Sequence, residues 1–176
     1  TLPKLPPPPL WEAKVDWTKH PGMAELDVKT SQGAVLEEEL QTTSRPDVIA
    51  QMLETLWKGD TQVIANPGEI NVVGHRVVHG GQEYQQATLI TPEVKEAIAN
   101  LSTFAPAHNP ANLEGIEAIE KILGTATPQV AVFDTAFHST LPLAAATYPV
   151  PYEWFEQGIR RYGFHGISHQ YCAHRT

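Results

Sequence analysis

A short apolar run in the last third of the chain ends in a carboxylate. Residues 129–133 read as a buried strand, because they are mostly apolar, and Asp134 follows them directly. In open α/β sheets, ligands bind beyond the carboxyl ends of the strands. An ionisable group near a core is costly without a partner, so this pattern indicates a site at Asp134.

Three other segments combine ionisable residues with glycine or apolar neighbours. They are residues 74–81 (GHRVVHGG), 107–112 (AHNPAN) and 160–169 (RRYGFHGISH). In the last of these, His165 stands in a glycine-flanked turn. His165 is therefore a second candidate for the site.

Arg76 lies in a segment that is predicted to be extended. Side chains alternate along a strand, so Arg76 and Val78 share one face. A guanidinium beside a small apolar group suits a short carboxylic acid, because the charged fork binds the carboxylate and the apolar group contacts the tail. The alternative is an arginine in a structural ion pair, and spacing alone does not decide between them.

Two histidine pairs, His75/His79 and His165/His169, follow an H-x-x-x-H pattern that invites a metal interpretation. On a strand the first pair would be roughly 13 Å apart, which is too far for one zinc ion. The second pair could lie on a helix, but a glycine stands where metalloproteases carry their general-base glutamate. We therefore do not expect zinc, and we expect His79 and His138 to have structural or supporting roles.

Alternating patterns predict three early antiparallel strands, over residues 11–18, 23–29 and 34–40. Residues 70–78 are mostly apolar and are predicted to form an interior strand.

Helices are predicted at three places. The first begins near Pro46, with Ser44 or Thr43 as its cap, and is ended by Gly59. The others begin at Pro92 and at residues 109–110, because proline favours the first turn of a helix.

Composition indicates a globular protein, with 41% hydrophobic and 18% charged residues among 176. The 12 basic and 20 acidic residues give a net charge of −8, which disfavours nucleic acid or an anionic membrane as a partner. The single Cys172 excludes an internal disulfide and is only weak support for a reducing compartment. A cytoplasmic location is expected. No apolar run approaches the roughly 20 residues needed to span a bilayer.

Four blocks in a fixed order carry a family resemblance: GHRVVHGG, FAPAHNPANLEGI, VAVFDTAFHSTLP and YGFHGISH. Through them the chain closely resembles the acetate kinase family, within the superfamily of acetate and sugar kinases, heat-shock ATPases and actin. The resemblance is specific from about residue 70 to the C-terminus and looser over residues 11–69.

The resemblance implies that the chain is an N-terminal fragment. Family members open with an Asn/Gly/Ser-rich phosphate loop, whereas this chain opens with a Pro-rich stretch over residues 1–10 that is expected to be flexible. Family members also carry a second phosphate loop, an adenosine pocket, another catalytic Arg and a metal-binding Glu beyond the point matching Thr176. We expect residues 1–176 to form an incomplete α/β domain of the actin-like, ribonuclease H-like type, with a mixed sheet and flanking helices. Residues 146–176 would lead toward a missing C-terminal domain.

The implied activity is transfer of the γ-phosphoryl group of ATP to acetate, with Mg²⁺, by a parent enzyme that is a homodimer. Arg76 and His165 would donate hydrogen bonds to the charge that develops in transfer, and His108 would contact the transferred group. Asp134 would act through Mg²⁺ or by orienting the nucleophilic carboxylate. The isolated fragment would be inactive. The structural alternatives are a turn cap for Asp134, a core position for His165 and a helix lead-in for His108.

By the same resemblance, Val78, Ala107 and Phe164 would surround the acyl tail, although each would also serve as ordinary core packing. A Leu is common in the family where this chain has Ala107, so propionate or a slightly longer acid could be accepted. Ile167 stands where a Thr is expected, which removes a hydroxyl. The functional alternatives are a propionate kinase, a catalytically silent actin-like module and a metal hydrolase.

Overall fold

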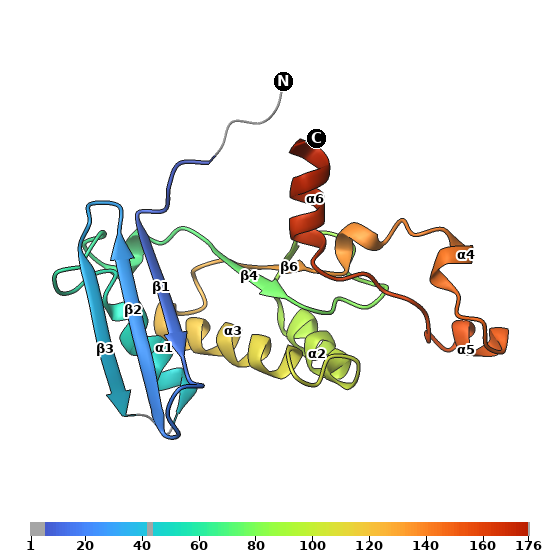
Figure 1. The fold of residues 1–176 in the computed structure, drawn as a ribbon, viewed down its shortest axis with the longest axis horizontal. Helices are drawn as coiled ribbons and strands as arrows, with labels where there is room; N and C mark the ends of the chain where they lie inside the picture. Colours follow the sequence, from blue (N-terminus) through green and yellow to red (C-terminus); the bar gives the residue numbers. More distant parts are fainter. Residues whose placement is uncertain (1–5, 42–43, 176) are drawn as a thin grey trace. The chain divides into compact units, whose positions relative to one another are not determined.

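The computed structural model describes residues 6–41 and 44–175, which group into two compact units. The N-terminal unit comprises residues 6–41, 44–71 and 114–127, and the site unit comprises residues 72–113 and 128–175. Figure 1 shows the order of their elements. The single incomplete domain predicted over residues 1–176 stays a prediction.

The N-terminal unit is built on a three-stranded antiparallel sheet. Strands β1 (Trp11–Asp16), β2 (Met23–Thr30) and β3 (Val35–Gln41) lie in the order β1-β2-β3, which confirms the predicted strands. Along β2, alternate residues Ala24, Leu26 and Val28 are buried, because successive side chains point to opposite faces. This face packs against helix α1 (Arg45–Glu54), whose Val48 belongs to the same core.

Helix α1 ends five residues before the predicted stop at Gly59. The amide of Leu56 bonds to the carbonyl of Leu53, and that of Trp57 to Glu54, so the last turn tightens to an i−3 pattern. The Thr55 hydroxyl also donates to the Met52 carbonyl and accepts from the Trp11 indole. This bridging hydroxyl competes with continuation of the helix.

The site unit holds a mixed sheet in the strand order β4-β6-β5. Strand β4 (Val73–Val77) runs parallel to β6 (Gln129–Phe133), and the short β5 (Thr88–Leu89) runs antiparallel to β6. The β6 bounds match the prediction. Strand β4 begins later than predicted, after the 3-10 turn η1 (Pro67–Glu69) and an irregular stretch. Because β4 and β6 are parallel, their carboxyl ends meet at one edge.

Helices α2 (Pro92–Asn100) and α3 (Asn109–Leu123) begin where the sequence predicts. The Thr91 hydroxyl caps α2 by accepting a hydrogen bond from the amide of Val94. The remaining short elements are η2 (Leu101–Thr103), η3 (Ala136–His138), α4 (Leu143–Ala146) and α5 (Tyr152–Glu156), and helix α6 (Gly166–Arg175) follows them.

A fully buried amide side chain fixes the segment that follows β4. Asn109 accepts a hydrogen bond from the His79 amide at 3.1 Å and donates to the carbonyls of His79 and Ile98, each at 3.2 Å. A buried backbone group left without a partner costs about 1–3 kcal/mol, so one side chain satisfies three groups that would otherwise be costly. The chain between β4 and α2 is thereby held in place.

Two sequence-based expectations fall outside the described residues: Thr43 as a helix cap, and the first half of the Pro-rich stretch. Residues 6–10, which are described, form neither helix nor strand. Across residues 6–41 and 44–175, no helix combines the length and the apolar character needed to cross a membrane.

Candidate active site

An ion pair joins the carboxyl ends of β4 and β6. The Arg76 Nε atom lies 3.0 and 3.1 Å from the two Asp134 carboxylate oxygens, and its Nη2 atom lies 2.6 Å from Oδ2. The Asp134 side chain is 1% exposed, whereas that of Arg76 is 57% exposed. The hydrogen bond to Asp134 raises the pKa of Arg76 above its ordinary value. The buried carboxylate is thus compensated by a guanidinium that still reaches solvent.

His165 joins this pair from the turn that precedes α6. Its Nδ1 atom lies 3.0 Å from Arg76 Nη2 and 4.0 Å from Asp134 Oδ2. A guanidinium only donates, so Nδ1 must accept, and a neutral His165 then carries its proton on Nε2. Arg76 therefore sets the tautomer of His165 and leaves its Nε2–H to donate to a ligand.

The backbone of His165 is held in an uncommon conformation. Its φ of 55° lies in the left-handed region, which non-glycine residues seldom adopt and which often marks functional sites. The next amide, that of Gly166, donates to the Asp134 carbonyl at 2.9 Å. A Cβ atom at Gly166 would collide with this same carbonyl oxygen. Glycine is therefore required where the turn passes over Asp134.

His138 fastens the other side of the turn. Its Nε2 atom lies 2.9 Å from the Phe164 carbonyl, and because a carbonyl only accepts, Nε2 carries the proton. A Cβ atom at Gly163 would collide with the His138 ring, so this contact also needs glycine. The turn is thus tied to η3 at His138 and to the end of β6 at Asp134.

An open cleft of about 490 Å³ borders the ion pair. Its wall is largely apolar, and Arg76, Asp134, His108 and His165 supply its charged and imidazole groups. Its lining residues are Arg76, Val78, Phe104, Ala105, Pro106, Ala107, His108, Asp134, Phe164 and His165. Every residue singled out from the sequence as catalytic or acid-binding therefore borders one cleft. Arg76, Asp134 and His165 also interact directly with one another.

Two polar residues that the sequence analysis did not single out stabilise the backbone beside this cleft. The Thr135 hydroxyl, which is buried, accepts from the Gly80 amide at 3.0 Å, and Asn112 accepts from the Val78 amide at 3.1 Å. Both satisfy backbone amides just beyond β4. The position of Thr135, a polar residue two positions after the end of a predicted buried strand, could have indicated its role.

Both histidines of the GHRVVHGG block, His75 and His79, form hydrogen bonds within the protein. His75 Nε2 lies 2.7 Å from the Gln129 side-chain oxygen, and burial lowers the pKa of His75. His79 is 2% exposed, and its Nδ1 accepts from the Gly81 amide, while burial lowers its pKa as well. Its ring packs among Phe104, Tyr162 and Phe164, which fits the structural role expected for it.

The Asp134 carboxylate does not fit direct coordination of Mg²⁺ in this arrangement. Both of its oxygens already accept from Arg76, and the side chain is almost completely buried. Mg²⁺ demands near-ideal octahedral geometry and usually keeps several waters, which need space around the ligand. The geometry instead shows Asp134 holding the Arg76 guanidinium, and the expected role of Asp134 in orienting the nucleophilic carboxylate stays a prediction.

Comparison with known proteins settles the family. A model of the acetokinase family matches residues 5–176. The chain belongs to the acetokinase family. The acetate kinase of Cyanothece sp. (strain PCC 7425) is 69% identical over 171 residues, and that of Gloeobacter violaceus is 62% identical over 175. These matches cover 97% and 99% of the chain, but only 42% and 43% of the relatives.

Solved structures of an acetate kinase and of a propionate kinase share this α/β fold. The crystal structure of Porphyromonas gingivalis acetate kinase is 38% identical, with a TM-score of 0.83, over 92% of this chain and 40% of that chain. A propionate kinase from Francisella tularensis is 35% identical, with a TM-score of 0.81, over 93% of this chain and 40% of that chain. The chain spans about two fifths of the length of the acetokinases it matches.

The position of Gly166 leads to a stability prediction. We expect Gly166→Ala to destabilise the full-length protein by about 1–3 kcal/mol, because the new methyl group must displace the Asp134 backbone. Gly74→Ala is the matched control, since nothing lies within 4 Å of a Cβ atom there. Thermal unfolding of both variants measures the difference. Equal melting temperatures would show that the turn does not pass closely over Asp134.

Proposed function

We propose that this chain is the N-terminal part of an acetate kinase, which transfers the γ-phosphoryl group of ATP to acetate and forms acetyl phosphate. The observation that carries the proposal is the exposed guanidinium of Arg76, held by Asp134 and bonded to His165, at one apolar cleft. Three of the four similar proteins described above are named acetate kinase, which supports the proposal.

Arg76 is suited to bind the carboxylate of the acid. A guanidinium has five N–H groups, and the bonds to Asp134 and His165 use those on Nε and Nη2. The Nη1 atom is left to donate to a ligand. Because both partners fix the plane of the guanidinium, its orientation is set before the acid binds, which lowers the entropic cost of binding.

The apolar part of the cleft is suited to the methyl group of acetate. Val78 follows β4 on the face that carries Arg76, and Ala107 and Phe164 line the same cleft. A methyl group against these side chains leaves water, while its carboxylate faces Arg76. The arrangement therefore favours a small acid with one charged end and one apolar end.

The chemical step is an in-line displacement at phosphorus. A carboxylate oxygen of acetate forms a bond to the γ-phosphorus, and the bond from that phosphorus to the bridging oxygen breaks. ADP leaves with the electron pair, and no proton has to move. Protein groups chiefly compensate charge on the equatorial oxygens, for which the His165 Nε2–H and Arg76 are suitable donors. His108, exposed at the same cleft, would contact the transferred group.

Asp134 would act in this reaction by orienting Arg76 and, through it, His165. Mg²⁺ would accompany the phosphates of ATP, whose charge it would neutralise. Most of the nucleotide site would belong to parts of the protein outside this chain. The homodimeric parent enzyme and the cytoplasmic location stay predictions.

A direct assay tests the proposed reaction. The full-length protein should form acetyl phosphate from ATP and acetate, and Arg76→Ala or His165→Ala should lower kcat by about 10²-fold or more, because each removes a donor to developing charge. His174→Ala, which removes an exposed imidazole outside the residues that line the cleft, should leave kcat unchanged. A folded wild-type protein without this activity would favour the silent actin-like module instead.

Propionate is the second candidate substrate, favoured by the small side chain of Ala107 and by the similarity to a propionate kinase. Ala107→Leu would fill space near the acyl tail, so kcat/KM for propionate should fall relative to acetate by roughly tenfold or more. Ala111→Leu, an exposed position on α3 that does not line the cleft, is the control. If Ala107→Leu leaves the ratio of the two kcat/KM values unchanged, Ala107 does not contact the tail.

A further inference from the structure

The exposed face of the N-terminal sheet brings two glutamates together. Glu25 on β2 and Glu39 on β3 are direct partners in the antiparallel register, so their side chains lie on the same face. The opposite face of β2 is the buried one. Two like charges directly opposite each other destabilise a sheet unless a positive group lies nearby. A nearby cation would therefore reduce the repulsion between Glu25 and Glu39.

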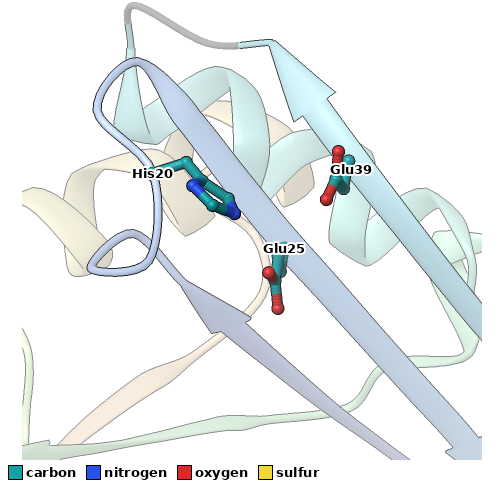
Figure 2. A group of neighbouring side chains, drawn as sticks. All are labelled: His20, Glu25 and Glu39. Carbon is teal, nitrogen blue, oxygen red and sulfur yellow. The ribbon is translucent and has the colours of Figure 1, made fainter.

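An imidazole reaches the same place from the turn between β1 and β2. The carbonyl of His20 accepts a hydrogen bond from the Met23 amide at 3.1 Å, and Gly22, with a φ of 76°, completes the turn. Figure 2 shows His20 beside Glu25, with Glu39 on the next strand. One ligand atom from each of the three residues lies within 4.8 Å of the other two.

That spacing brings the three residues within reach of one metal ion. A tetrahedral zinc ion binds nitrogen and oxygen ligands at about 2.0–2.2 Å, which places two ligand atoms roughly 3.3–3.6 Å apart. Side-chain rotations that bring the three ligand atoms closer by up to about 1.5 Å would therefore close the site. All three residues retain contact with solvent, which leaves room for water as a further ligand.

Lys19 competes for this position. Its ammonium group forms a short ion pair with Glu25, which raises the pKa of Lys19 above its ordinary value. The Lys19 side chain is 55% exposed, and surface ion pairs contribute little to stability because water and salt screen them. A divalent ion can therefore displace it.

We propose that His20, Glu25 and Glu39 form a binding site for a divalent transition metal ion of the zinc class. One imidazole and two carboxylates suit Zn²⁺, Co²⁺ or Ni²⁺ better than Mg²⁺, which prefers oxygen ligands alone. The bound ion joins the turn at His20 to two neighbouring strands and neutralises the pair of glutamates. The site lies in the N-terminal unit and does not rest on the proposed phosphoryl transfer.

Calorimetric titration of the full-length protein with Zn²⁺ tests the site. We expect wild-type protein to bind one more Zn²⁺ than His20→Ala, or to bind one Zn²⁺ at least about tenfold more tightly, and Glu39→Gln to show the same loss. Lys19→Met should tighten binding because it removes the competing ammonium. Titration with Mg²⁺ should show no difference between wild-type and His20→Ala.

Glu37→Gln is the matched control. Glu37 pairs with Asp27 on the same face of the sheet, so the variant removes an equal charge from a second acidic pair that lacks the imidazole. Zn²⁺ binding should be unchanged in Glu37→Gln. If His20→Ala binds Zn²⁺ like the wild type, or if Glu37→Gln loses as much as Glu39→Gln, the acidic face attracts cations diffusely and the proposed site does not exist.

Discussion

The ion pair between Asp134 and Arg76 is the interaction on which the site depends. A carboxylate that is 1% exposed would be very costly alone, and Arg76 satisfies both of its oxygens. Removing one partner of such a pair leaves an uncompensated buried charge, which is far more damaging than the pair is stabilising. The pair therefore fixes the carboxyl ends of β4 and β6 together and decides which way the guanidinium points.

Backbone hydrogen bonds and close contacts fix the positions of the residues around the ion pair. The Asp134 amide donates to the Val77 carbonyl, and the Asp134 carbonyl accepts from Gly166, so one residue connects both strands to the turn before α6. Gly80 lies so close to the Phe133 ring that a Cβ atom there would collide with it. Close approaches of this kind place His165 against Arg76 with one tautomer, before any ligand binds.

The sequence predicted the local features of this arrangement well. Alternation along residues 74–79 put Arg76 and Val78 on one face, and both border the cleft. The short apolar run put Asp134 directly after a strand, with bounds that match β6. The acetokinase resemblance was confirmed over residues 5–176. These features depend on period-2 patterning and on motifs, and both involve residues that are close together in the sequence.

Other features depended on contacts between distant residues. Arg76 is 58 positions from Asp134 and 89 from His165, so no local pattern could distinguish a site arginine from a structural one. At the early end of α1, Thr55 is bonded to Trp11, which lies 44 positions away in the sequence. The sequence does not predict the cluster of His20, Glu25 and Glu39, because its members come from a turn and two strands, and register alone brings Glu25 and Glu39 together. The catalytic roles of the cleft residues stay proposals.

A double-mutant cycle on the full-length protein tests the central claim most directly, namely that Asp134 acts by holding Arg76 in the proposed reaction. The quantity to measure is kcat/KM for acetate in Arg76→Ala, in Asp134→Asn and in the double variant, each first shown to be folded. If Asp134 acts through Arg76, the double variant should lose about as much as the worse single variant, because effects of residues that act as a unit are not additive. Losses that multiply in full would contradict the account and would favour an independent role for Asp134, such as metal binding.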